Sequence, residues 1–384
     1  MGQPLSVLIV GGGIGGLSAA LALSHVGCRV SVFERAEDFR PIGAGLQLSA
    51  NALSVLEKVG LTMRGRNGID IASTDVCDGH SGKLISRIAT PKDNKTLVIS
   101  RPDLQATLLR AVAADENIEL NTCAEVVDIL GGKSVTSLTL ADGTMRTGDV
   151  LIGADGVWSQ TRRFINSTRP DYSGRIAWRA TMPLSQVPAD ISRHTVTLWL
   201  AKGAHLVTYP IANGTAFNAV GIVQDDWQAE GWTQTGDMTE LALAFSEWYS
   251  PVQRLLQSTH AWQKWALCTI DPTVSWTKGR MALLGDAAHA MVPFMAQGAG
   301  MSIEDAWVIA RHLATANRDT VPQALAAYQD ERQDRVTKVW ETSMQQGKIY
   351  HLSGPMRLSR NLVMHAAGNL MKNRYNWIYD WRAV

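Results

Sequence analysis

The first 34 residues carry the pattern that most constrains the fold. Residues 6–10 are a short apolar run typical of a strand, a glycine cluster at 11–16 follows it directly, and residues 17–27 are rich in Ala and Leu, as a helix would be. A second apolar run ends in Glu34, which lies 18 residues beyond the last glycine of the cluster. Strand, glycine turn, helix, strand and terminal acid together predict the βαβ unit of a dinucleotide-binding domain.

Each residue type in this unit suits that chemistry. Gly11 allows the tight turn, Gly13 lets the backbone approach a pyrophosphate, and Gly16 lets the helix pack on the strand. The start of the following helix offers free N–H groups and partial positive charge to the phosphates, and Ile14 in the turn before it is also expected at the cofactor. Glu34 is expected to accept hydrogen bonds from a ribose, with Arg35 beside it, and an acid here favours FAD or NAD over NADP. Glycine-rich turns also occur as purely structural features.

Composition excludes several other classes of protein. The chain has 36 Lys+Arg against 35 Asp+Glu and is 46% hydrophobic, so it offers no basic field for nucleic acid. Its four cysteines are scattered, which predicts neither a disulfide framework nor a metal site and favours a cytoplasmic protein. The uncharged stretch 5–23 has the length of a membrane span, but its glycines and the βαβ pattern argue against a membrane protein.

Two later segments also place an aspartate at the end of an apolar run. The first runs into Gly153-Ala154-Asp155-Gly156, followed by Ser159 and Arg162 at helical spacing. The second, residues 280–284, runs into Gly285-Asp286. Beyond it come Pro293 and a set of small residues at 297–302 that open a helix continuing through residue 313.

These three motifs, in this order and at this spacing, resemble those of single-component FAD-dependent aromatic hydroxylases of the para-hydroxybenzoate hydroxylase class, and the resemblance covers nearly the whole chain. Within the class, the chain is most similar to the salicylate hydroxylase, 3-hydroxybenzoate 6-hydroxylase and 6-hydroxynicotinate 3-monooxygenase group. That likeness depends on residues 43–48, on Arg179-Ala180 and on Gly285 to His289.

The resemblance and the composition together predict an α/β fold with three parts. A discontinuous Rossmann-type FAD-binding domain comprises residues 1–76, 99–172 and 278–345. A mainly antiparallel β-sheet substrate domain, read from alternating and apolar runs, comprises 77–98 and 173–277. Residues 346–384 form a helical C-terminal segment, which either covers the cleft or packs against a second subunit. A monomer or a homodimer is expected.

The resemblance also implies roles for individual residues. Glu34 would hold the adenosine ribose, Asp286 the ribityl chain, and Arg101 the region of the pyrophosphate and ribityl. Asp155 and Arg162 are linked in the class both to FAD binding and to passage of the nicotinamide donor, and a structural role for Arg162 stays open.

The helix that begins after Pro293 has a physical reason to lie beside a flavin. A reduced flavin carries negative charge around N1 and C2=O, which free N–H groups at a helix start would stabilise. Pro293 would lie against the flavin face where oxygen reacts. The alternative is a capped helix with packing glycines. The residues expected here at the cofactor are Gly298, Ala299, Gly300 and Met301.

A hydroxylase of this class also needs a base, because a phenolate is attacked more readily than a phenol. On a strand, His205, Val207 and Tyr209 would share one face, although such a pair is usually packing. In similar enzymes the histidine of this spacing is the catalytic base and the tyrosine binds substrate. Gln47, at a position that holds a histidine in the hydroxynicotinate enzyme, is expected to contact the substrate or the flavin. Phe294 is also expected at the substrate, but the hydroxynicotinate enzyme has a histidine there, which weakens a hydroxynicotinate assignment.

The predicted function is that of an FAD-dependent monooxygenase, which uses NAD(P)H and O2 to hydroxylate a small hydroxylated aromatic acid through an FAD C4a-hydroperoxide. NADH is favoured over NADPH as the donor. No second GxGxxG motif follows in the sequence, so the nicotinamide is expected to bind transiently, without a Rossmann domain of its own. The substrate, the position hydroxylated and the arginine that binds a carboxylate stay open, with Arg87 and Arg179 as candidates. An FAD-dependent epoxidase or oxidase acting on a non-phenolic substrate, and a non-catalytic flavin-binding sensor, are the alternatives.

Seven further histidines show no convergent partners in the sequence and are expected to be structural or exposed: His25, His80, His194, His260, His312, His351 and His365.

Overall fold

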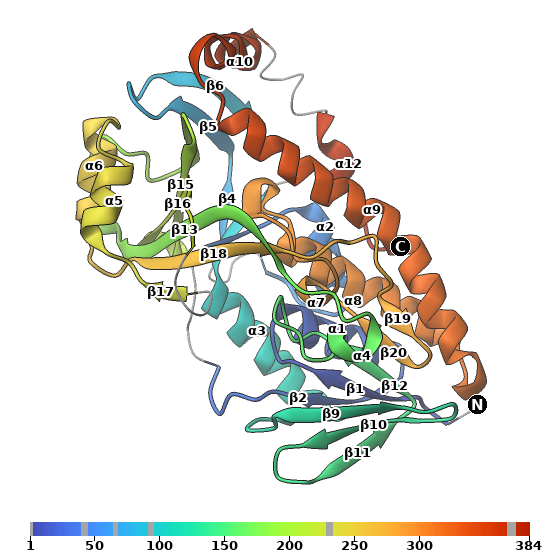
Figure 1. The fold of residues 1–384 in the computed structure, drawn as a ribbon. Helices are drawn as coiled ribbons and strands as arrows, with labels where there is room; N and C mark the ends of the chain where they lie inside the picture. The colour runs from blue at the N-terminus through green and yellow to red at the C-terminus, as the bar shows by residue number, and fades with distance from the viewer. Residues whose placement is uncertain (1–2, 40–44, 64–67, 91–95, 228–232, 367–373) are drawn as a thin grey trace.

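The computed structural model describes residues 3–39, 45–63, 68–90, 96–227, 233–366 and 374–384. Gly43 and Ala44, which carry part of the resemblance, lie outside these ranges. The described residues form four β-sheets, of which two define the architecture (Figure 1).

The first large sheet is the predicted dinucleotide-binding sheet. Its strands β1, β2, β8, β12 and β20 run parallel, and β19 pairs antiparallel at one edge. The inner strands are apolar runs buried on both faces, as expected where helices cover the two sides of a parallel sheet. In spatial order the strands are β19 (Thr277–Lys278), β20 (Met281–Leu283), β12 (Val150–Gly153), β1 (Ser6–Val10), β2 (Arg29–Phe33) and β8 (Ile118–Asn121).

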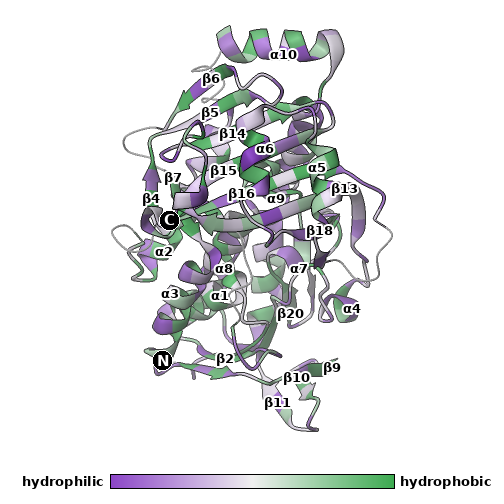
Figure 2. Ribbon diagram, turned by 90° about the vertical axis from the view of Figure 1, so that its left-hand side faces the viewer, coloured by the Kyte–Doolittle hydropathy of each residue, from purple (hydrophilic) through white to green (hydrophobic). Residues whose placement is uncertain are grey.

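The second large sheet has eight strands and is mostly antiparallel, with one parallel pair between β14 and β5. Figure 2 shows these strands in succession from β6 to β18, with α5 (Met238–Ala244) and α6 (Ser250–Gln257) in front of them. In spatial order the strands are β17 (Thr233–Thr235), β18 (Gln263–Thr269), β13 (Asp171–Pro183), β16 (Ala216–Gln224), β15 (Ala204–Ile211), β14 (Val196–Ala201), β5 (Ser73–Asp78) and β6 (Leu84–Ala89).

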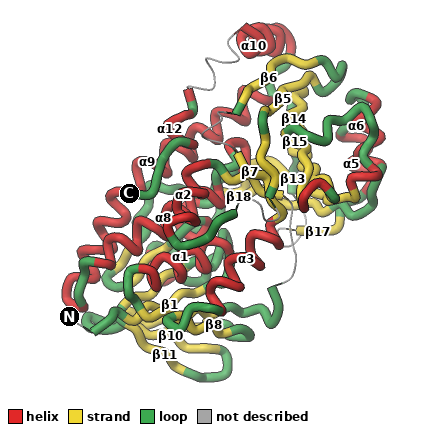
Figure 3. The backbone as a smooth tube through the Cα atoms, turned by 180° about the vertical axis from the view of Figure 1, so that it is seen from behind, coloured by secondary structure: helices red, strands yellow, loops and turns green. Residues whose placement is uncertain are grey.

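Helices lie between the two large sheets and beside them. Figure 3 shows α1, α2, α3 and α8 in the layer between the strands of the two sheets, and Figure 1 shows the long helix α9 along one side of the molecule. None of the described helices is both long and apolar enough to cross a membrane. Besides α5 and α6, the described α-helices are α1 (Ile14–His25), α2 (Ala50–Lys58), α3 (Arg101–Ala113), α4 (Arg162–Ile165), α7 (Asp286–His289), α8 (Gly298–Ala314), α9 (Val321–Tyr350), α10 (Gly354–Ala366) and α12 (Asn376–Tyr379).

Two three-stranded sheets complete the described part of the chain. One consists of β3 (Gly45–Leu48), β7 (Thr96–Ser100) and β4 (Ile69–Ile71), and the other of β11 (Met145–Gly148), β10 (Thr136–Leu140) and β9 (Val126–Gly131). Short 3-10 helices cover Leu184–Gln186, Ala212–Gly214, Pro293–Met295 and Arg318–Thr320.

The predicted fold class is confirmed. The parallel sheet takes its strands from three separate stretches of sequence, between which the strands of the antiparallel sheet are inserted. Residues 77–98, assigned from the sequence to the antiparallel domain, include β6 and the end of β5, which pair with each other. However, β5 already begins at Ser73, and β7 pairs with β3 and β4 instead. The helical C-terminal part begins within α9, which continues to Tyr350.

Candidate functional site

A cavity of about 1240 Å³ lies where the carboxyl ends of the parallel strands face one side of the eight-stranded sheet. Its lining includes the glycine turn after β1, the loop after β12, the start of α8 and the inner face of β15. Pockets for one small molecule are commonly about 300–1,000 Å³. The cavity therefore has room for a dinucleotide together with a small second ligand.

The glycine turn shows which glycines are needed for close packing and which one leaves open space beside it. Gly11 has φ +105°, and a Cβ there would lie 2.5 Å from the carbonyl oxygen of Ala154. A Cβ on Gly16 would lie 1.9 Å from the carbonyl oxygen of Gly11. By contrast, no atom lies within 4 Å of a Cβ on Gly13, which lines the cavity before α1. Gly13 thus leaves open the place where a pyrophosphate would meet the start of α1.

Glu34 lines the cavity and is bound to the turn itself. Its Oε2 accepts a 2.8 Å hydrogen bond from the Gly12 N–H, and its Oε1 accepts one of 3.0 Å from the Ala36 N–H. Because a carboxylate oxygen has two lone pairs, each oxygen can still accept from a ribose hydroxyl. Arg35 also lines the cavity.

Asp155 and Arg162 stabilise the loop after β12. Asp155 accepts hydrogen bonds from the Ser159 hydroxyl and from the backbone N–H groups of Gln160 and Thr161. It also lines the cavity. The buried Arg162 donates to three backbone carbonyl oxygens, one of which, at Ala287, belongs to α7. These contacts support the structural interpretation of Arg162.

Only part of the segment predicted to contact the cofactor at the start of α8 lines the cavity. Gly298 and Ala299 line the cavity, as do Asp286 and Pro293. Gly300 and Met301 are buried and do not line it. A Cβ on Gly300 would lie 2.8 Å from the Gln297 side-chain oxygen, so this glycine has a packing role.

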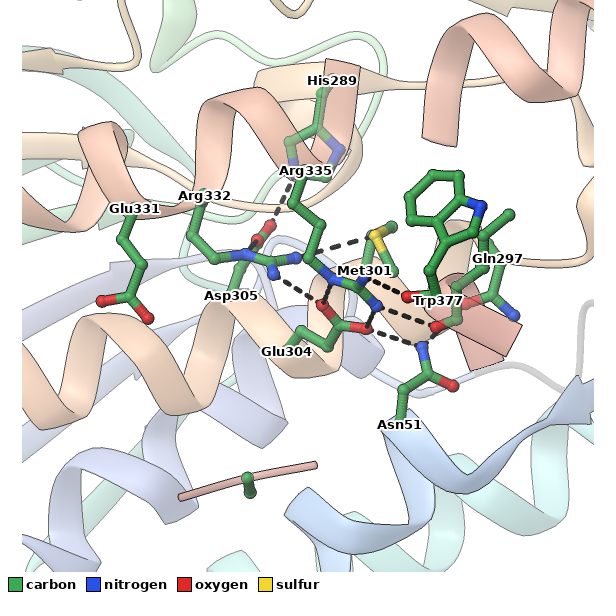
Figure 4. A network of polar contacts seen from close by, with 12 residues as sticks. Asn51, His289, Gln297, Met301, Glu304, Asp305, Glu331, Arg332, Arg335 and Trp377 are labelled. Carbon is green, nitrogen blue, oxygen red and sulfur yellow. Dashed lines mark hydrogen bonds and ion pairs between the residues drawn. The ribbon is translucent and has the colours of Figure 1, made fainter. Parts of the chain in front are cut away.

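Behind this helix start lies a buried network of ion pairs (Figure 4). Arg332 contacts Glu304 at 2.6 Å and Asp305 at 2.7 Å, and all three side chains are at most 1% exposed. Arg335 also contacts Glu304, and Asn51 joins the Glu304 carboxylate to the Gln297 side chain. The network therefore fixes α8 against α9 and α2.

Asp305 connects this network to the loop that precedes α7. Its Oδ2 accepts from the Gly285 N–H and lies 2.6 Å from Nε2 of His289. Burial alone would raise the pKa of Asp305, but His289 and Arg332 outweigh it and lower that pKa to about 2. His289 is therefore part of the structural network.

The opposite wall of the cavity is the inner face of the eight-stranded sheet. His205, Val207 and Tyr209 all line the cavity from β15, in agreement with the strand period. Burial lowers the pKa of His205 well below its usual value and raises that of Tyr209. The Tyr209 ring packs closely on Gly45, where a Cβ would lie 2.5 Å from the ring. Both side chains are held neutral at physiological pH.

Arg179 is the arginine that lines the cavity from the eight-stranded sheet. It lines the cavity from β13, and its guanidinium carbon lies 5.2 Å from the centre of the Trp265 ring. Burial lowers its pKa, against the opposing effects of Tyr209 and Asp286. Arg87, the other candidate from the sequence, pairs with Asp75 outside the cavity, and its side chain is 61% exposed.

Arg101, Gln47 and Phe294 also line the cavity, so the structure brings together most of the residues that the sequence singled out. Phe294 presents an edge to His205 at a ring-centre distance of 5.1 Å. Among the described residues, no group of three or more His, Cys, Asp or Glu side chains could hold a metal ion.

Several lining residues come from the C-terminal part of the chain and were not identified from the sequence. Tyr379 donates to the Met295 carbonyl oxygen at 3.3 Å, and Tyr375 donates to the Gln346 side chain at 2.8 Å. Arg335 holds this segment through two backbone carbonyl oxygens. The one available signal was the density of aromatic residues after position 374. The lining residues of this region include Gln346, Tyr350, Met364, Tyr375, Asn376, Tyr379 and Asp380.

The open face of Gly13, the two helix starts and the size of the cavity fit an FAD molecule. A model of the FAD binding domain family matches residues 4–343. The chain is 34% identical, over 99% of its length and 98% of the relative's, to a 3-hydroxybenzoate 6-hydroxylase of Aquipseudomonas alcaligenes. It is 33% identical, over 98% and 96% of the two chains, to a 3-amino-4-hydroxybenzoate 2-monooxygenase of Streptomyces platensis.

Two solved structures share the fold of this chain. A salicylate hydroxylase substrate complex superimposes on this chain with a TM-score of 0.85 at 26% sequence identity. The superposition covers 99% of this chain and 96% of the salicylate hydroxylase chain. HpxO of Klebsiella pneumoniae, complexed with FAD and uric acid, shares the fold with a TM-score of 0.83 at 23% identity, over 98% and 96% of the two chains.

Proposed function

The chain belongs to the family of FAD-dependent aromatic hydroxylases, and we propose that it uses NADH and O2 to hydroxylate a small aromatic acid that already carries a hydroxyl group. The finer parts of this proposal are the nicotinamide donor and the substrate class. The observation that carries it is the inner wall of the cavity, where a buried histidine, a buried tyrosine and a half-buried arginine face the same space as Pro293 and the start of α8.

The residues of this wall match the chemistry of a phenolic acid. His205 is neutral, so it can accept the proton of a ring hydroxyl and leave a phenolate. Arg179 is a cation whose Nε is buried without a hydrogen-bond partner among the described residues, and a carboxylate or phenolate would supply one. Tyr209, close to Arg179, would donate to the same ligand.

The remaining wall is apolar and would hold a flat ring. Val220 and Ile222 line it from β16 and Leu267 lines it from β18, beside Phe294. Such side chains orient an aromatic ring by contact area and exclude water from it. FAD, when bound, supplies the transfer of electrons from the nicotinamide donor and the activation of O2.

Two sets of residues would hold the FAD. Gly13 and the start of α1 would receive the pyrophosphate, and Glu34 a ribose. Asp286, Gly298 and Ala299 would lie at the ribityl and ring end.

The test is NADH oxidation by the FAD-loaded protein with and without hydroxylated aromatic acids, with products identified by mass. The relatives direct the panel toward 3-hydroxybenzoate and 3-amino-4-hydroxybenzoate, and salicylate, 4-hydroxybenzoate and 6-hydroxynicotinate complete it. We expect one acid to accelerate NADH oxidation and to gain one oxygen atom. NADPH serves as the comparison donor.

Matched variants locate the activity in this cavity. Arg179→Gln is expected to raise KM for the acid about 10- to 100-fold, since a charge-assisted hydrogen bond is lost. Arg87→Gln removes a cation outside the cavity and should leave KM unchanged. If no phenolic acid is oxygenated while a non-phenolic compound is, the epoxidase or oxidase alternative replaces this proposal.

A further inference from the structure

The proposed base has a hydrogen-bond partner that lies 146 residues away in the sequence. Nδ1 of His205 on β15 is 2.8 Å from Nε2 of His351, the residue that follows α9. The two imidazole rings lie 5.1 Å apart, centre to centre. His205 lines the cavity and His351 does not, so His351 contacts the side of the ring that faces away from a ligand.

We infer that His351 is a positioning residue, which accepts the Nδ1 proton of His205 and thereby leaves Nε2 of His205 unprotonated toward the substrate hydroxyl. This inference rests on the proposed function. A neutral imidazole carries one N–H, so a His205 that accepts a proton at Nε2 must carry its own at Nδ1. His351 then has to be the acceptor in the pair.

The surroundings of the pair keep both rings neutral and oriented. His205 packs edge-on against Phe294 and Tyr350, with ring centres 5.1 Å and 5.3 Å away. Burial disfavours a proton on either ring, and the cation of Arg175 on β13 adds to this effect for both. Together with Arg360 on α10, they lower the pKa of His351 to about 4.

The second nitrogen of His351 argues against a proton relay. Nδ1 of His351 is buried and has no hydrogen-bond partner among the described residues. A relay would need an acceptor there to carry the proton onward. The proton taken from the substrate therefore stays on Nε2 of His205, whose Nδ1–H bond to His351 becomes stronger because the donor is now charged.

The first test reads the tautomer directly and needs no turnover. In the FAD-loaded protein labelled with ¹⁵N-histidine, two-bond ¹H–¹⁵N correlations show which nitrogen of His205 carries the proton, and the signal is identified from its loss in His205→Gln. We expect Nδ1–H in the wild type and Nε2–H, or a mixture of tautomers, in His351→Phe. Nε2–H in the wild type would overturn the inference.

The second test uses turnover with the acid that the panel identifies. His351→Phe keeps a ring but removes the acceptor, and we expect kcat to fall about 10- to 100-fold with KM changed less than about threefold, because the orientation of a general base is lost. His351→Gln keeps an acceptor and should restore kcat to within about threefold of the wild type. His260→Phe, at an exposed histidine, is the matched control.

The two proposals fail in different ways. If no phenolic acid is oxygenated but the tautomer follows His351, the proposed function fails and the pairing stands. If an acid is oxygenated while His351→Phe has wild-type kcat, pH profile and tautomer, the positioning role fails alone.

Discussion

Replacement of Gly13 by alanine separates cofactor binding from folding more sharply than any other change in the glycine turn. Gly13 has φ −73° and ψ −177°, which alanine adopts without strain, and no atom lies within 4 Å of the added Cβ. Alanine reduces the entropy of the unfolded chain but is a poorer helix N-cap than glycine, two opposing effects of about 0.5–1 kcal/mol. The free energy of unfolding of the apoprotein should therefore change by less than about 1 kcal/mol.

The same methyl group projects into the space assigned to the pyrophosphate. A displaced phosphate would lose at least one charge-assisted hydrogen bond to the backbone, which is worth about 1.5–3 kcal/mol. The Kd for FAD should therefore rise roughly 10- to 150-fold. Urea unfolding of the apoprotein and titration of flavin fluorescence measure the two quantities separately.

Gly16→Ala is the matched comparison. Its Cβ would lie 1.9 Å from a backbone oxygen, so this variant should lose about 3 kcal/mol or more of stability before any cofactor is added. The reasoning is refuted if Gly13→Ala binds FAD within threefold of the wild type, or if it destabilises the apoprotein as much as Gly16→Ala does.

Three further predictions concern the buried network and the cavity. Arg332→Met should lower the free energy of unfolding by about 3–5 kcal/mol, because it removes the buried cation that Glu304 and Asp305 share and leaves them only Arg335 and His289, whereas Arg335→Met should cost less since Arg332 remains; urea unfolding measures both. Asp305 has a folded-state pKa of about 2, below its usual value of 3.8, so it contributes roughly 2 kcal/mol at neutral pH that is lost as the pH falls from about 5 toward 2; stability that stays constant over this range contradicts the assignment. Tyr379→Phe removes one hydrogen bond to the loop at Met295 and should change KM for the acid more than stability, as steady-state kinetics and thermal unfolding together would show.

Local patterns predicted the parts of the molecule that neighbouring residues specify. The βαβ unit follows from residues 6–34 because strand, turn and helix are adjacent in the sequence, and the shared face of His205 and Tyr209 follows from the strand period. Of the four residues predicted to meet the cofactor at the start of α8, Gly298 and Ala299 line the cavity, whereas Gly300 and Met301 do not.

Contacts between distant segments were beyond the reach of such patterns. His351 was expected to have no convergent partner, yet it contacts His205 across the interface between α9 and the eight-stranded sheet. Tyr375 and Tyr379 reach the cavity because Arg335 holds the backbone of the last helix, a connection for which no sequence periodicity exists. The choice between Arg87 and Arg179 likewise needed the pairing of Arg87 with Asp75.

The most direct test of the account is turnover of the FAD-loaded protein under ¹⁸O2 with NADH and the acid that accelerates its oxidation, in the wild type and in His205→Gln. The account predicts a product that has gained one labelled oxygen atom, with kcat about 10²- to 10⁴-fold lower in the variant, because a general base is lost. Formation of hydrogen peroxide alone for every acid, or an unchanged yield of labelled product in His205→Gln, would contradict it.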